Sequence, residues 1–159
     1  MVRSTKQHAL VISLDIKGAF DHLEYNSIKN SINNSNFHSN TKETLIDILS
    51  GRQVALNTSQ GPATLPQHRG CPQGSWTGPV FWNLVANEVL TQSWPEGVHL
   101  QAFADDFIFL IKAPTKAKVK SLANEALNQF KSWAATHNVE ISADKSNYMH
   151  FNKNRNGPR

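Results

Sequence analysis

The chain has 159 residues, of which 39% are hydrophobic and 18% are charged. This length suits one domain with a real core and is short for a complete multidomain enzyme. The single cysteine excludes an internal disulfide framework and a cysteine-cluster zinc site. No apolar run approaches the roughly 20 residues that span a bilayer, and the first residues lack the apolar core of a signal peptide. We therefore expect an intracellular protein without a membrane partner.

Charge is distributed unevenly along the chain. The formal net charge is +4, but residues 1–110 hold seven Lys and Arg against nine Asp and Glu, whereas residues 111–159 hold nine against three. An acidic N-terminal part and a basic C-terminal part suit a protein that binds metal ions in one part and a polyanion in the other. A basic tail that is simply solvated explains the same distribution, so charge permits nucleic-acid binding without showing it.

The first predicted element ends at an aspartate. The apolar run over residues 9–14 predicts a buried strand, and Asp15 follows it directly. A carboxylate at the end of a buried strand is costly to desolvate unless something pairs with it, so Asp15 is a candidate functional residue. Asp21 precedes a helix predicted over residues 22–34, and its position favours an N-cap over a metal ligand.

Apolar periodicity and turn residues predict the remaining elements. A loop rich in Gly and Pro over residues 69–79 offers backbone that a ligand can approach closely, or is a plain loop. The other elements are a helix over 41–50 ended by Gly51, a strand pair over 52–57 and 63–65, a buried helix over 79–90, an amphipathic helix over 115–136 and strands at 139–141 and 148–151. Helices that alternate with antiparallel hairpins predict an α+β fold, with the helices packed on one face of the sheet.

The stretch from Gln101 to Lys112 carries two adjacent aspartates, Asp105 and Asp106, at the turn between two apolar strands. An isolated Asp-Asp pair is most often a solvated turn. If the strand before Asp15 lies beside this hairpin, however, three carboxylates converge at one edge of the sheet. Such a cluster could hold two Mg²⁺ ions about 4 Å apart, as phosphoryl transfer requires. Hard oxygen ligands without Cys or His favour Mg²⁺ or Mn²⁺ over zinc.

Four motifs in the chain resemble those of a known family, in the family's order and across residues 9–151. They are the stretch 14–21 (Leu-Asp-Ile-Lys-Gly-Ala-Phe-Asp), the stretch 70–74 (Gly-Cys-Pro-Gln-Gly) with Gly78, Pro79 and Asn83, the stretch 103–106 (Phe-Ala-Asp-Asp), and the stretch 141–151 with Trp133 before it. Together they resemble the palm of a reverse transcriptase, an RNA-directed DNA polymerase, of the non-LTR (LINE-like) retrotransposons. Viral RNA-dependent RNA polymerases are similar in architecture but usually carry Gly-Asp-Asp at the turn.

The resemblance implies a catalytic role for four side chains. Asp15 and Asp105 would bind both metal ions, with the carbonyl of Ile16 as an additional oxygen ligand. Asp106 would bind one ion or shape the field around them. Lys145 would protonate the departing pyrophosphate, since an ammonium group beside a polyphosphate has both charge and a proton to give. An ordinary surface lysine is the alternative for Lys145.

The resemblance also implies a nucleotide site. The backbone N–H groups of Gly18 and Ala19 would meet the triphosphate. Phe20 would pack under the sugar and exclude a 2′-hydroxyl, which argues for deoxynucleotides, although an ordinary core phenylalanine is the simpler explanation outside this motif. Gln73 would contact the incoming nucleotide and the template base pair, and Arg69 would add positive charge.

The implied fold is a polymerase palm with a ferredoxin-like core, formed by residues 1–151, without fingers or thumb. Residues 152–159 would be a frayed polar tail. The implied partners are an RNA template, a DNA primer and dNTPs, together with the fingers, thumb and endonuclease of a longer polyprotein, in the nucleus and cytoplasm. We expect little or no processive synthesis by the chain alone. A remnant with the palm fold that only binds nucleic acid or protein is the alternative.

Overall fold

The computed structural model describes residues 7–71 and 74–151, which form two compact units. The sheet unit contains the chain up to Lys17, the segment Val89–Thr136 and the segment from Glu140 onward. The helix–hairpin unit contains Gly18–Glu88 and His137–Val139. Within the described ranges, no helix is long and apolar enough to cross a membrane.

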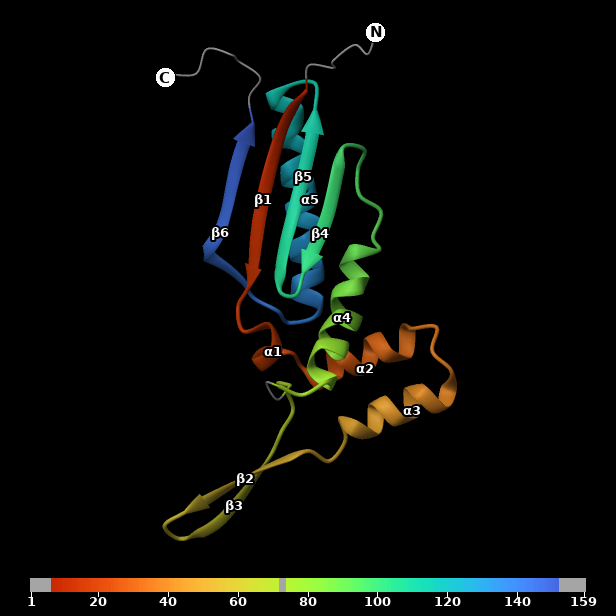
Figure 1. The fold of residues 1–159 in the computed structure, drawn as a ribbon, viewed down its shortest axis with the longest axis vertical. Helices are drawn as coiled ribbons and strands as arrows, with labels where there is room; N and C mark the ends of the chain where they lie inside the picture. The colour runs from red at the N-terminus through yellow and green to blue at the C-terminus, as the bar shows by residue number, and fades with distance from the viewer. Residues whose placement is uncertain (1–6, 72–73, 152–159) are drawn as a thin grey trace. The chain divides into compact units, whose positions relative to one another are not determined.

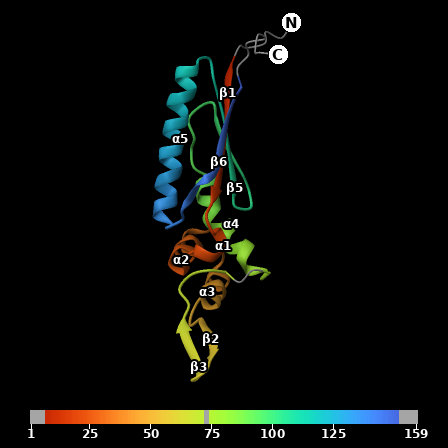
Figure 2. The same cartoon turned by 90° about the vertical axis from the view of Figure 1, so that its left-hand side faces the viewer.

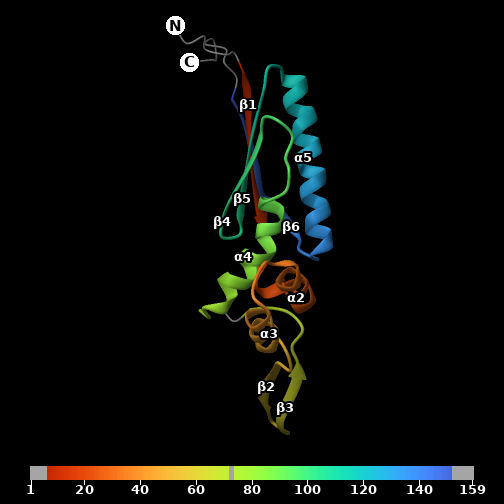
Figure 3. The ribbon, with the colours of Figure 1, turned by 90° about the vertical axis from the view of Figure 1, so that its right-hand side faces the viewer.

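The sheet unit is built on a four-stranded antiparallel sheet (Figure 1). The strands lie in the order β4-β5-β1-β6, which is the order of a ferredoxin-like core. Their bounds are β1 (His8–Ile16), β4 (Val98–Phe103), β5 (Asp106–Ala113) and β6 (Ile141–Phe151). One helix, α5 (Lys116–Thr136), runs along one face of this sheet, as Figures 2 and 3 show from opposite sides. The predicted α+β fold with an antiparallel sheet is confirmed.

Alternation along the strands separates the two faces of the sheet. Leu14 on β1 and Phe107 and Phe109 on β5 are buried, and the rings of both phenylalanines contact Phe130 of α5 at centroid distances of 5.0 and 5.7 Å. The residues between them along each strand point the other way, because successive side chains of a strand alternate between faces. The second face, which we call the open face, therefore carries the odd-numbered residues of β1, including Asp15.

The helix–hairpin unit packs short helices around an apolar core. Its elements are α1 (Ala19–His22), α2 (Tyr25–Asn34), α3 (Ser39–Ile48), β2 (Gln53–Thr58), β3 (Gly61–Pro66) and α4 (Thr77–Leu90), the last of which continues into the sheet unit at Val89. The fully buried side chains of the core include Leu23, Ile28, Phe81 and Trp82. Strands β2 and β3 form a separate two-stranded sheet, and every residue of β2 is exposed.

The helix predicted over residues 22–34 is two helices, and Asp21 does not cap either of them. Asp21 lies inside α1, and α2 begins only after Glu24. The helix is interrupted because Leu23 is extended and its carbonyl accepts a hydrogen bond from the N–H of Gly70 (2.9 Å). Pairing with a segment distant in sequence thus overrides the local capping pattern.

The two strands predicted at 139–141 and 148–151 form one strand with a bulge. Asn147 lies opposite Ser13, and Ser142 lies opposite Asp15. The residues from Ala143 to Ser146 therefore occupy the place opposite a single residue of β1, which bends the strand locally. The other predicted helices and strands are confirmed, with ends that differ by a few residues.

A chain of buried hydrogen bonds, which the sequence pattern does not indicate, lies inside the helix–hairpin unit. The Nδ1 atom of His137 lies 2.7 Å from the hydroxyl of Ser27, and its Nε2 atom lies 2.8 Å from Glu88. Ser31 donates a further hydrogen bond to the same carboxylate. The buried His137 thus links α2 to the end of α4, through a buried contact with Ser27 and a partly buried contact with Glu88.

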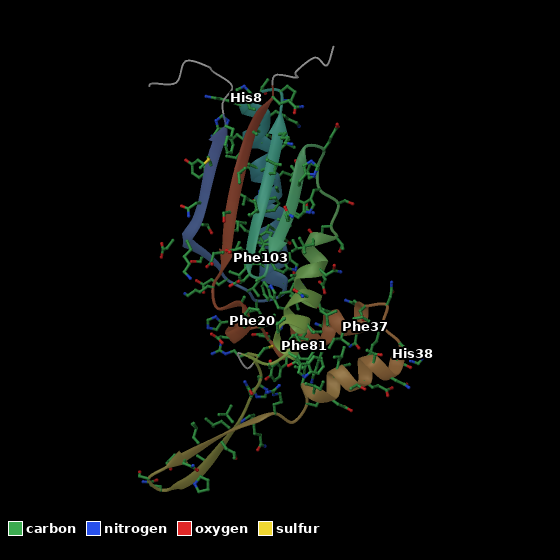
Figure 4. All side chains as sticks on the ribbon, in the orientation of Figure 1. His8, Phe20, Phe37, His38, Phe81 and Phe103 are labelled. Atoms are coloured by element: carbon green, nitrogen blue, oxygen red, sulfur yellow. The ribbon has the colours of Figure 1, made fainter. Side chains whose placement is uncertain are left out.

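Replacement of His137 by alanine should destabilise the chain, because Ser27 and Glu88 each lose a buried hydrogen-bond partner. We expect the free energy of unfolding in urea to fall by about 2 kcal/mol. His38→Ala is the control, since His38 is exposed at the N-cap of α3 and makes no side-chain capping bond (Figure 4). An equal, small loss in both variants would show that the buried network does not stabilise the fold.

Candidate active site

The candidate site begins with the register of β1 and β5. Asp15 lies directly opposite Asp106, and Leu14 lies opposite Phe107. Directly opposed residues of an antiparallel pair project to the same face. Because Leu14 and Phe107 are buried on the face covered by α5, the two aspartates project together to the open face. The sequence-based expectation that these carboxylates meet at one end of the sheet agrees with this register.

The third carboxylate lies in the turn between β4 and β5. Asp105 follows Ala104, whose φ of 54° lies in the left-handed region that a residue with a Cβ rarely adopts. This turn leaves Asp105 partly buried and Asp106 exposed as the first residue of β5. The two adjacent aspartates therefore occupy different surroundings.

An aromatic side chain completes this row of residues. Phe103 lies opposite Asp106 at the end of β4 (Figure 4), and the residue is 84% exposed. Water exposure of so large an apolar surface is unfavourable, and a ring in this position can pack on a sugar or base. The sequence alone indicates no such role for Phe103, because a phenylalanine in an apolar strand is typical of a core residue.

The bulge of β6 brings two more side chains to Asp15. The Nζ atom of Lys145 lies 3.7 Å from Oδ2 of Asp15, and the lysine side chain is 73% exposed. The hydroxyl of Ser146 accepts a hydrogen bond from the N–H of Asp15 (3.4 Å) and donates one to the carbonyl of Ser142 (2.6 Å). Ser146 thus fastens the bulge to the end of β1, a role that only the register reveals.

The donor atoms at this site fit a hard divalent cation. The side chain of Asp15 is 19% exposed, and its buried Oδ2 atom has no hydrogen-bond partner among the described residues. A buried carboxylate oxygen without a hydrogen bond is unfavourable, and a cation would satisfy it. No group of three His, Cys, Asp or Glu side chains in the described ranges is arranged to hold a metal by itself. Magnesium sites commonly combine one or two carboxylates with substrate phosphates and water.

The predicted nucleotide-binding residues belong to the helix–hairpin unit. Gly18 has a φ of 56° and is the N-cap residue of α1, and Ala19 is buried. Phe20 packs against Trp82 with ring centroids 6.1 Å apart, and its carbonyl accepts a hydrogen bond from the N–H of Cys71 (2.8 Å). Arg69 is exposed in an isolated antiparallel bridge with Glu24, whereas Gln73 lies outside the described residues.

Two groups of the helix–hairpin unit have shifted pKa values. Burial raises the pKa of the Cys71 thiol, and the nearby Arg52 opposes part of this rise. Burial also raises the pKa of the Tyr25 phenol, whose hydroxyl donates a hydrogen bond to the carbonyl of Gly70 (3.0 Å). A buried thiol with a raised pKa is a poor nucleophile at neutral pH, so Cys71 has a packing role beside Phe20.

Comparison with known proteins decides the family. Residues 1–156 match the family model for the reverse transcriptase (RNA-dependent DNA polymerase). The chain belongs to the reverse transcriptase family. This membership confirms the resemblance drawn from the four motifs.

Relatives of this reverse transcriptase chain come from insect retrotransposons. It is similar to the Pol polyprotein of the type-1 retrotransposable element R1 of Bradysia coprophila, with 30% identity over 156 residues, which are 96% of this chain and 15% of that protein. It is also similar to a 115 kDa protein of the element R1DM of Drosophila melanogaster, with 28% identity over 146 residues, covering 92% of this chain and 14% of the relative. The chain thus spans about a seventh of the length of these relatives, which are proteins of LINE-like elements.

Solved structures support the palm fold of this reverse transcriptase. The chain resembles telomerase of Candida tropicalis in complex with a fragment of telomeric RNA, with a TM-score of 0.71 and 15% identity. The match covers 96% of this chain and 27% of the telomerase chain. The apo form of the same telomerase matches with a TM-score of 0.67 over 92% of this chain and 29% of that one, at 14% identity. At this identity the likeness establishes the fold alone.

Proposed function

We propose that this chain is the catalytic palm of an RNA-directed DNA polymerase that extends a DNA primer with dNTPs on an RNA template. The observation that carries the proposal is the register that sets Asp106 opposite Asp15, with Asp105 in the adjoining turn. Family membership supports the same reaction. The reaction joins the primer 3′-oxygen to the α-phosphorus of a dNTP, and the bond to pyrophosphate breaks.

Two divalent ions would be held on the open face of the sheet unit. Asp15 and Asp105 would ligate both ions, with the backbone carbonyl of Ile16 as a further ligand and Asp106 as a supporting carboxylate. The buried Oδ2 of Asp15, which makes no hydrogen bond within the described residues and lies 3.7 Å from the Lys145 ammonium group, supports this assignment. Mg²⁺, or Mn²⁺ in its place, would supply activation of the attacking hydroxyl and neutralisation of the leaving oxygens.

Lys145 would supply the proton that leaves with pyrophosphate. Its Nζ lies 3.7 Å from Asp15, and its exposure leaves the ammonium group accessible to a bound substrate. This ion pair joins an ammonium group that is 73% exposed to a carboxylate that is 19% exposed, and it holds the lysine beside the carboxylate that would bind the metal ions. Ser146 would act as a positioning residue, since it holds the bulge that presents Lys145.

The nucleotide would be selected by residues of the helix–hairpin unit. The N–H groups of Gly18 and Ala19 would contact the triphosphate, and Phe20 would leave no room for a 2′-hydroxyl. The contact between Phe20 and Trp82 supports this role, because a ring fixed by packing can act as a steric barrier. Gln73 would contact the nucleotide and the template base pair, and Arg69 would add positive charge there.

The remaining polymerase segments would come from a longer retrotransposon polyprotein. The chain spans only 14% and 15% of the two relatives described above. Fingers and thumb would grip the template–primer duplex, and an endonuclease would supply the primer end. The 159-residue chain alone would show little or no processive synthesis.

Loss of the two turn aspartates should abolish primer extension. We would join the chain to fingers and thumb segments from a related R1 polyprotein and assay poly(rA)/oligo(dT) extension. The Asp105→Asn/Asp106→Asn variant should lower kcat by at least about 10³-fold, because metal ligation stabilises the transition state by several kcal/mol. Asp144→Asn is the matched control, since Asp144 is an exposed aspartate in the β6 bulge and has no assigned role. Undiminished extension by the double variant would contradict the proposed mechanism.

Removal of the Lys145 ammonium group should lower the rate of the chemical step. The Lys145→Ala variant should lower kcat about 10²-fold with little change in KM, because a general acid acts only in the transition state. Lys120→Ala, an exposed lysine on α5, is the control. A kcat of Lys145→Ala equal to that of the control would remove the lysine from the mechanism.

A further inference from the structure

A cavity of about 330 Å³ lies within the helix–hairpin unit, and it shares no residue with the candidate active site. Three stretches of chain line it: the first turns of α2, the end of α3 with the start of β2, and the end of β3. The lining side chains include Tyr25, Lys29, Leu49, Arg52, Pro66 and His68.

Backbone hydrogen bonds hold the three stretches together. The N–H of Tyr25 donates to the carbonyl of His68 (3.0 Å), which joins the start of α2 to the end of β3. The N–H of Gln67 donates to the carbonyl of Arg52 (2.9 Å), which closes the base of the hairpin. Gly51, with a φ of 64°, lets the chain turn sharply between α3 and Arg52. The cavity is therefore a formed feature of the fold.

The charges that line the cavity are all positive. Lys29 follows Tyr25 by one helical turn and so lies on the same face of α2, and Arg52 lies across from it at the base of the hairpin. No carboxylate lines the cavity, and neither cation has an ion-pair partner in the part of the chain that the structure describes. Arg52 is only partly exposed, and its charge acts on both the buried phenol of Tyr25 and the thiol of Cys71.

We propose that this cavity binds a phosphodiester of a single-stranded RNA, outside the catalytic site. A partly buried arginine without a carboxylate partner suits a phosphate, which it can bind through two parallel hydrogen bonds. The cavity is larger than a phosphate alone needs, and Leu49 and Pro66 give it an apolar wall against which a ribose or base can pack. The choice of RNA as the strand rests on the proposed function, whereas the phosphate chemistry rests on the cavity.

Binding of a labelled oligo(rU) strand to the 159-residue chain tests the inference by fluorescence anisotropy at several salt concentrations. The Lys29→Gln/Arg52→Gln variant should bind at least about tenfold more weakly, and its salt slope should fall by about 0.7 for each phosphate that the protein no longer neutralises. Arg52→Lys keeps the charge but loses the two parallel hydrogen bonds, so it should bind more weakly than the wild type and more tightly than the double variant. Lys116→Gln/Lys120→Gln removes the same charge from α5 of the sheet unit and is the control. Circular dichroism establishes that each variant is folded.

Amide chemical shifts distinguish the possible outcomes. Oligo(rU) should shift the amides of Tyr25, Gly51 and Gln67, and it should do so equally in the Asp105→Asn/Asp106→Asn variant, whose loss of catalysis is a separate result. An equal loss of affinity in the cavity variant and the α5 control would overturn the inference. Shifts at these amides with uridine monophosphate but not with oligo(rU) would assign a free nucleotide and would also overturn it.

Discussion

The antiparallel register between β1 and β5 is the constraint on which the site depends. Side chains alternate along a strand, so the pairing that buries Leu14 and Phe107 beneath α5 also turns Asp15 and Asp106 to the open face. A slip of one residue would carry the carboxylates into the apolar core and expose the phenylalanines. The contacts of Phe107 and Phe109 with Phe130 therefore specify the position of the acidic pair as well as stabilising the fold.

The bulge of β6 imposes a second constraint on the same carboxylate. Without the bulge, β6 would pair with β1 residue by residue up to the end of β1. Side chains of β6, including that of Lys145, would then alternate regularly between the two faces of the sheet. The extra residues between Ser142 and Asn147 instead place Lys145 beside Asp15, while Ser146 bonds to the backbone of Asp15 and to Ser142. Asp15 of β1 thus has an acidic neighbour, Asp106, on the adjacent strand β5 and a basic neighbour, Lys145, on the adjacent strand β6.

Most helices and strands could be predicted because their signals are local. The apolar run before Asp15, the hairpin around Asp105 and the periodicity of α5 depend only on neighbouring residues, and all three are confirmed. The predicted N-cap role of Asp21 is wrong because the helix break at Leu23 depends on pairing with Gly70, a contact between distant parts of the chain. Contacts between distant parts of the chain also explain three features that the sequence does not indicate. These are the continuity of β6, the hydrogen bond between Ser146 and Asp15, and the buried contacts of His137.

The candidate site was predictable in its residue types but not in its arrangement. Adjacent aspartates on a hairpin, taken with Asp15 at the end of a buried strand, indicate metal chemistry. Only the register, however, shows which aspartate faces Asp15 and that Phe103 lies exposed beside the pair. The most direct test of metal binding at this site is paramagnetic broadening of amide resonances by Mn²⁺. We expect broadening centred on residues 14–16 and 104–107, lost in Asp15→Asn. Broadening centred elsewhere, or unchanged in that variant, would contradict the proposed metal site.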